Sequence, residues 1–120
     1  MRIGELAKKS GLSRDTIRFY ERNGLITSYA SQDPQNTYRY YPDSLLEDLE
    51  MIAAARNVGF SIPDLQVFLG ANQDLQADDV FLDQKITELE QKLKQTRSLL
   101  ALLKQTRTAL AKGPIEWRAE

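Results

Sequence analysis

The feature that most constrains this chain is a long stretch, residues 78–112, that contains neither glycine nor proline. Apolar residues recur there at alternating spacings of four and three over four heptads, which is typical of a coiled-coil helix. A helix of this length extends about 50 Å, and a domain of roughly 80 residues cannot cover its apolar stripe alone. We therefore predict that it pairs with a second copy of the chain. The predicted dimer seam consists of Leu82, Ile86, Leu89, Leu93, Thr96, Leu100, Leu103, Arg107 and Leu110.

Two seam positions are not aliphatic. Thr96 is expected to mark the register of the pairing. For Arg107 two interpretations stay open: its head reaches solvent near the helix end, or it contacts an anion or an acidic group at the dimer interface. Gly113-Pro114 ends the helix and leaves a short tail, 113–120, whose Trp117 is expected to pack on the other subunit.

The composition excludes most enzymes. The 120 residues include no cysteine and no histidine, so disulfides, thiolate metal sites and the usual general base are missing. No Ca²⁺-binding loop motif appears either. We expect no catalytic residue, no cofactor and no metal. No apolar run is long enough to cross a bilayer and no signal peptide is apparent, so we expect a soluble, cytoplasmic protein.

The near-zero net charge of −1 hides a marked asymmetry. Residues 1–42 carry seven basic and four acidic side chains, a net charge of +3. Residues 43–120 carry nine and thirteen, a net charge of −4. This division favours a basic working surface at the N-terminal end of the chain.

The first 25 residues read as two short helices joined by a tight turn. Leu6 lies on the apolar face of the first, which Gly11 ends. Ser13 offers a hydroxyl to the free amides at the start of the second. Ile17 continues the apolar face and Gly24 stops it. This pattern predicts a helix-turn-helix unit.

A β-hairpin is predicted next, over residues 26–42, because β-favouring residues flank the turn sequence Asp33-Pro34-Gln35-Asn36. Asp43-Ser44 is then expected to cap a helix that Gly59 ends. Ser61 is expected to cap a further short helix.

The second helix carries a stripe of guanidinium groups. Arg14, Arg18 and Arg22 lie four residues apart on its outer face, an arrangement suited to a DNA major groove because arginine binds phosphates and guanine edges bidentately. The structural alternative is a solvated helix face, partly neutralised by Asp15 and Glu21.

The hairpin offers a second candidate contact, the sequence Tyr38-Arg39-Tyr40-Tyr41. An arginine between tyrosines suits a phosphate backbone or a minor groove. The alternative is that the aromatic rings pack the hairpin onto the helices, which we expect for two of the three. Arg39 is the side chain expected to reach DNA.

These motifs together resemble the MerR family of bacterial transcription regulators. The match covers residues 1–70 in order, and the long helix continues it to about 112. The motifs are Ile3-Gly4-Glu5-Leu6-Ala7, then Ser13-x-x-Thr16-Ile17-Arg18-Phe19-Tyr20-Glu21-x-x-Gly24-Leu25-Ile26, then Tyr38-Arg39-Tyr40-Tyr41, then Val58-Gly59-Phe60-Ser61-Ile62.

The resemblance implies a mainly α protein, a winged helix-turn-helix DNA-binding domain followed by an antiparallel coiled-coil dimer helix. It also implies a homodimer that binds a palindromic operator within an over-long promoter spacer and distorts that DNA, so that RNA polymerase sees both promoter elements in phase. Arg14 is added from helical geometry rather than from a motif. The predicted DNA-binding residues are Arg14, Thr16, Arg18, Tyr20, Arg22, Tyr38 and Arg39.

The chain departs from the family pattern at several points. Phe19 stands where many members have tyrosine, and Thr37 where the wing usually has glycine. Asp33-Pro34 looks like the multidrug-responsive branch, whose large drug-binding domain we expect to be absent. Metal- and redox-responsive members place cysteines after the dimer helix, so those signals are not expected here. A small-molecule pocket at the dimer end, a protein partner or no effector remain possible.

We accordingly expect a DNA-binding domain at 1–70, a joint at 71–77, a dimerisation helix at 78–112 and a tail at 113–120. Two alternative functions stay open. One is a plain repressor or architectural DNA-binding protein without an effector. The other, from a different class, is a coiled-coil module that binds protein rather than DNA.

Overall fold

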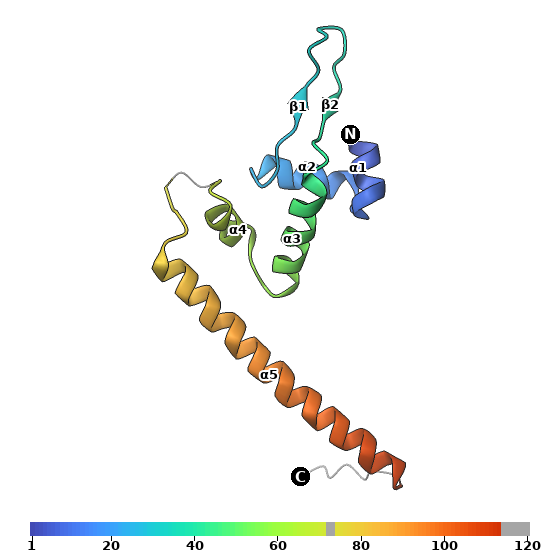
Figure 1. The fold of residues 1–120 in the computed structure, drawn as a ribbon, viewed down its shortest axis with the longest axis vertical. Helices are drawn as coiled ribbons and strands as arrows, with labels where there is room; N and C mark the ends of the chain where they lie inside the picture. The colour runs from blue at the N-terminus through green and yellow to red at the C-terminus, as the bar shows by residue number, and fades with distance from the viewer. Residues whose placement is uncertain (72–73, 114–120) are drawn as a thin grey trace. The chain divides into compact units, whose positions relative to one another are not determined.

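The computed structural model describes residues 1–71 and 74–113. They form two compact units, Met1–Asp78 and the part that begins at Asp79, and each is treated by itself. The first unit holds four helices and a small hairpin, and the second is one long helix (Figure 1). The elements are α1 (Ile3–Ser10), α2 (Arg14–Arg22), β1 (Tyr29–Ala30), β2 (Arg39–Tyr40), α3 (Leu45–Asn57), α4 (Ile62–Phe68) and α5 (Asp79–Ala111).

Helices α1 and α2 form the predicted helix-turn-helix pair. Gly11 ends α1 in the left-handed conformation, with φ of 75°, which glycine adopts without steric cost. Two residues later the Ser13 hydroxyl accepts a hydrogen bond from the Thr16 backbone N–H at 3.1 Å. The predicted helix end and the predicted cap are both confirmed.

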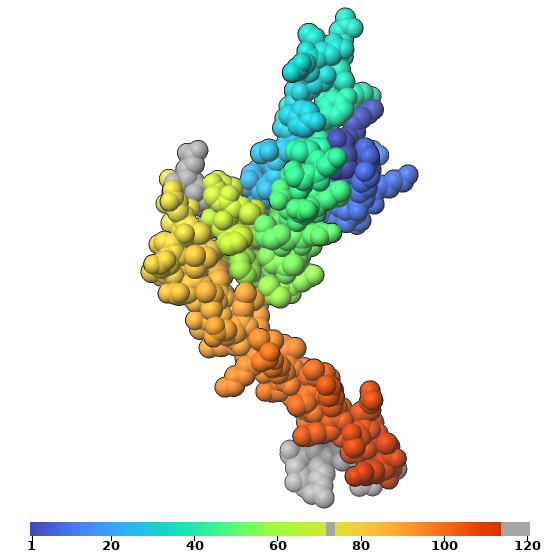
Figure 2. All heavy atoms as spheres, viewed as in Figure 1, coloured from blue at the N-terminus to red at the C-terminus, as the bar shows by residue number. Residues whose placement is uncertain are grey.

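The predicted hairpin is confirmed as a wing. Strands β1 and β2 pair antiparallel, with Tyr29 opposite Tyr40 and Ala30 opposite Arg39. The Asn36 N–H donates to the Asp33 carbonyl at 3.0 Å, which closes the predicted turn. The wing projects from the helices of its unit as a narrow finger (Figure 2). Only two residues of each strand are paired, so the tip depends on its turn rather than on a ladder.

The two following helices begin in different ways. At α3 the expected cap is wrong: Ser44 has helical backbone angles and makes no side-chain cap hydrogen bond. A turn replaces it, in which Leu45 N–H donates to the Pro42 carbonyl. At α4 the expected cap is confirmed, because the Ser61 hydroxyl and the Asp64 carboxylate each accept from the other residue's backbone N–H, both at 3.0 Å.

The core of the first unit lies where α1 packs against α2 and α3. Four of its side chains are almost completely buried, and they come from four different helices: Leu6, Ile17, Ile52 and Leu65. The remaining members of the cluster are Tyr20, Leu25, Ile26, Tyr41, Leu45 and Leu49. These contacts fix one face of α2 against the protein and leave the opposite face to solvent.

Helix α5 confirms the predicted long helix, and it has no buried residue. Its seam leucines are exposed in the single chain, with Leu103 at 57 %, except for Leu89, which is partly buried. Leu99 and Leu102, which the seam does not include, are each exposed at 56 %. None of the described helices has the length and hydropathy to cross a membrane. The tail contact expected of Trp117 lies outside the described residues.

The two helix starts give a matched stability test. Replacing Ser61 with alanine removes the capping hydroxyl and should lower the free energy of unfolding by about 1 kcal/mol. Replacing Ser44 with alanine should change it by less than about 0.5 kcal/mol, because that hydroxyl caps nothing. Urea unfolding followed by circular dichroism measures both. Equal losses would show that the capping box contributes nothing specific.

Candidate DNA-binding surface

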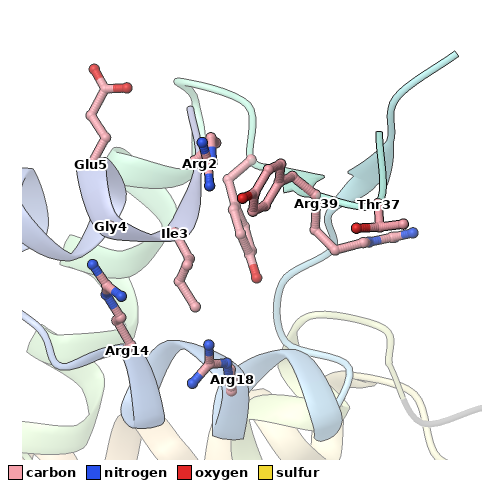
Figure 3. A pocket seen from close by; sticks show the side chains of 10 residues that line it. Arg2, Ile3, Gly4, Glu5, Arg14, Arg18, Thr37 and Arg39 are labelled. Atoms are coloured by element: carbon pink, nitrogen blue, oxygen red, sulfur yellow. The ribbon is translucent and has the colours of Figure 1, made fainter. Parts of the chain in front are cut away.

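The start of α1, the outer face of α2 and the wing surround a hollow of about 600 Å³ (Figure 3). In this view Arg14 and Arg18 rise from α2, and Arg2 lies at the start of α1. Glu5 is the one acidic side chain among the lining residues. Four guanidinium groups against one carboxylate make the hollow strongly positive. Those four are Arg2, Arg14, Arg18 and Arg39.

The two α2 arginines have different neighbours within the protein. The Arg14 guanidinium lies over Gly4, where an added Cβ would come within 2.8 Å of its nitrogen, so Gly4 leaves the space that this group occupies. Arg18 pairs with Asp15 at 3.7 Å, and both side chains are more than half exposed. An exposed pair of this kind contributes little, so a phosphate can displace Asp15.

The N-terminus of the described chain is tied to the wing. The Met1 nitrogen donates to the Tyr41 carbonyl at 2.8 Å, and the Tyr41 N–H donates to the Met1 carbonyl at 2.6 Å. The Arg2 guanidinium carbon lies 3.4 Å from the centroid of the Tyr38 ring, a cation–π contact. Arg2 thus joins the basic surface although sequence reasoning did not select it.

A carboxylate on α2 holds both ends of the hairpin. Glu21 accepts a hydrogen bond from the Tyr41 hydroxyl at 2.7 Å and one from the Ser28 hydroxyl at 2.5 Å. Ser28 in turn accepts from Arg39, through its hydroxyl at 2.9 Å and its carbonyl at 2.8 Å. Burial, followed by the bond to Glu21 and its charge, raises the pKa of Tyr41 to about 12. The Tyr41 hydroxyl therefore keeps its proton at neutral pH.

The structure brings some of the predicted DNA-binding residues together and separates others. The residues that line the hollow are Arg14, Arg18, Tyr38 and Arg39. Arg22 is exposed farther along α2 but does not line it. Thr16 hydrogen-bonds Ser13 side chain to side chain at 2.8 Å, within the α2 cap.

Tyr20 needs a different assignment. The sequence prediction placed it among the DNA contacts, but it is only 9 % exposed and belongs to the apolar cluster behind α2. Tyr20 follows the buried Ile17 by three residues, so both lie on the face of α2 that packs against the core. This burial does not support a DNA contact, and we assign Tyr20 to the core.

Comparison with known proteins finds similar transcription regulators. The HTH-type transcriptional regulator YfmP of Bacillus subtilis is 39 % identical over 77 residues, covering 63 % of this chain and 54 % of YfmP. The heavy metal-dependent transcription regulator 2 of Rhizobium meliloti is 33 % identical, covering 90 % of this chain and 71 % of that protein. A solved structure of PbrR691 from Ralstonia metallidurans CH34 with lead(II) matches with a TM-score of 0.57 and 28 % identity, covering 90 % and 86 %.

The metals in those names do not fit the donors of this chain. Lead and similar soft metals bind thiolate and imidazole groups, and the 120 residues contain neither cysteine nor histidine. Within 1–71 and 74–113, no group of three or more acidic residues is arranged to hold a metal ion.

Two family models match almost the whole described chain. The model of the MerR HTH family regulatory proteins matches residues 1–71, more than half of the sequence. A second model, described as MerR, DNA binding, matches residues 46–106 and so extends from α3 into α5. With a helix-turn-helix, a wing and a basic surface between them, the chain belongs to the MerR family of DNA-binding transcription regulators.

Proposed function

We propose that the chain binds promoter DNA as a homodimer, with the outer face of α2 in the major groove and the wing on the neighbouring phosphate backbone. The observation that carries this proposal is the hollow between α2 and the wing, whose lining includes four arginines and one acidic residue. Guanidinium groups at that density need anionic partners, and duplex DNA supplies them at regular spacing. An α-helix fits the major groove.

The regulatory step that we propose is distortion of the operator. As implied by the family, a palindromic site within an over-long promoter spacer would be bent and untwisted, which realigns the promoter elements for RNA polymerase. A plain repressor would instead bind between normally spaced elements and lower transcription.

The distribution of charge along α5 supports antiparallel pairing. Between residues 79 and 90, α5 has four acidic side chains and one basic side chain. Between residues 91 and 111 it has five basic and no acidic side chains. Antiparallel pairing places each acidic half against a basic half, whereas parallel pairing would align like charges. Arg107 would then lie near the acidic half of the partner helix.

This proposal leaves no role for catalysis. The relatives are transcription regulators, and we infer that this chain is not an enzyme and acts in the bacterial cytoplasm, where promoter DNA is found. The alternative of a module that binds only protein is disfavoured by the hollow, since the helix-turn-helix keeps its guanidinium stripe outward.

The DNA interface can be tested at Arg18. Replacing Arg18 with alanine removes a guanidinium from the hollow and should weaken operator binding by about 1–3 kcal/mol. The operator is obtained by selecting duplexes from a random 30-base-pair pool with the full chain, and binding is measured by fluorescence anisotropy. If Arg18 binds a phosphate, the slope of log affinity against log salt should become shallower by about 0.9 for each phosphate that the variant leaves unneutralised.

The control is Lys94→Ala, which removes the same charge from an exposed position of α5 outside the seam. It should leave affinity and salt slope almost unchanged. Unchanged binding by the Arg18 variant would contradict the assignment of α2 as the recognition helix. Failure of the unaltered chain to select any duplex would contradict DNA binding itself.

The antiparallel dimer can be tested by reversing charge. Glu88→Lys with Glu90→Lys makes both halves of α5 basic, so the dissociation constant of the dimer should rise at least about tenfold. Each exposed charge pair contributes roughly 0.2–1 kcal/mol, and the dimer contains several such pairs. Adding Lys104→Glu and Arg107→Glu should restore much of it, because in the antiparallel pairing the reversed positions of one helix again lie near opposite charges on the other. Sedimentation equilibrium measures both constants.

In a parallel dimer each of these positions faces its own copy, so the second pair of substitutions would not rescue the first. A chain that stays monomeric at micromolar concentration would contradict the coiled coil. Helix content by circular dichroism serves as the control, since Lys85 pairs with Glu88 within the same helix at 3.2 Å.

A further inference from the structure

The chain contains an acidic residue on its DNA-facing helix that neither the sequence pattern nor the basic hollow explains. Glu21 lies on α2, one turn after Arg18, where a carboxylate would repel phosphates. It is partly buried rather than pointing freely into solvent. Both of its oxygens accept hydrogen bonds from the hairpin, so this charge is used within the protein.

The residues that Glu21 binds occupy equivalent places at the two feet of the wing. Ser28 immediately precedes β1 and Tyr41 immediately follows β2. The register pairs Tyr29 with Tyr40, so the next position outward pairs Ser28 with Tyr41. One carboxylate thus holds both strands where they leave the helices. The β2 foot is also tied to Met1 by two backbone hydrogen bonds of Tyr41, whereas Glu21 is the group that joins the two feet to each other.

The same serine holds the wing arginine. The Ser28 hydroxyl donates to Glu21 and accepts from the Arg39 Nε–H, so both its donor and an acceptor position are used. The Ser28 carbonyl accepts from a terminal nitrogen of Arg39. Of the five N–H groups of a guanidinium, these bonds take two and leave three for a phosphate. Arg39 is therefore oriented in advance while still exposed.

We infer that Glu21 and Ser28 are positioning residues for DNA binding: through hydrogen bonds to both feet of the wing, they hold the Arg39 guanidinium in the orientation in which it binds the phosphate backbone. This inference rests on the proposed function. Ordering Arg39 before binding removes part of the rotamer entropy that a long side chain loses when it contacts DNA. The Glu21 carboxylate, which by its charge would repel DNA, thus helps to orient the Arg39 guanidinium that binds it.

A double-mutant cycle tests the connection. In the full chain, Ser28→Ala should weaken binding to the selected 30-base-pair duplex about tenfold, because in both copies of the dimer it removes the hydroxyl that bonds Arg39 Nε and links Arg39 to Glu21, and leaves only the bond to the Ser28 carbonyl. In the Arg39→Ala background the same substitution should change affinity by less than about twofold, since the guanidinium that Ser28 orients is gone. Ser28→Thr keeps the hydroxyl and should restore binding. Glu21→Gln also removes a charge that repels phosphates, so its effect is compared between the two backgrounds: it should weaken binding in the unaltered chain relative to its effect in Arg39→Ala.

The matched control is Ser31→Ala, because Ser31 lies on the same hairpin and its hydroxyl accepts from the Asp33 N–H rather than from Arg39. It should leave the affinity within about twofold of the original. Equal effects of Ser28→Ala in both backgrounds would overturn the inference, since they would show general loosening of the wing. An unchanged affinity in the Ser28→Ala variant would overturn it as well.

A second measurement needs no DNA. In ¹H–¹⁵N spectra the Nε–H of Arg39 should exchange slowly with water in the unaltered chain and quickly in Ser28→Ala and Glu21→Gln. Fast exchange in the unaltered chain would contradict the inference and leave DNA binding intact. If the unaltered chain selects no duplex, the proposed function and this inference fail together.

Discussion

Burial of Ile17 against the other core residues is the interaction on which the rest of the structure depends. Ile17 is fully buried, together with Leu6 from α1 and Ile52 from α3. Because a helix has fixed angular positions, burying Ile17 turns the stripe of Arg14 and Arg18 outward. The candidate DNA-binding surface is thus set by apolar packing behind it. The arginines themselves contribute little to holding that surface in place.

Basic and acidic side chains are concentrated in different parts of the chain. The hollow gathers cations from α1, α2 and the wing, while acidic side chains predominate in the remainder of the sequence. Glu21 shows how a carboxylate is accommodated within the basic region, through two hydrogen bonds that compensate its partial burial. Along α5 the charges separate again into an acidic and a basic half, which supports the antiparallel pairing that we propose.

The sequence predicts helix ends, caps and turns correctly where a few neighbouring residues decide them. Gly11 ends α1, Ser13 and Ser61 cap their helices, and the turn at 33–36 closes the hairpin, since each depends on neighbours within a few residues. Ser44 was misassigned because the chain turns at Pro42 and supplies the helix start with backbone carbonyls. The residues of the dimer seam and the domain boundaries stay predictions, because a single chain does not show what its long helix packs against.

By itself, the sequence determined the helix periods, the caps of α2 and α4, the asymmetry of charge and the lack of thiolate and imidazole ligands, since these follow from composition and spacing. Only the tertiary structure decided which side chains meet across the fold. It buried Tyr20, brought Arg2 over Tyr38, and joined Glu21 to Ser28 and Tyr41. The physical reason is that the hydrogen bonds of Glu21 join residues 7 and 20 positions apart. They depend on how the wing packs against α2, and no local pattern encodes that packing.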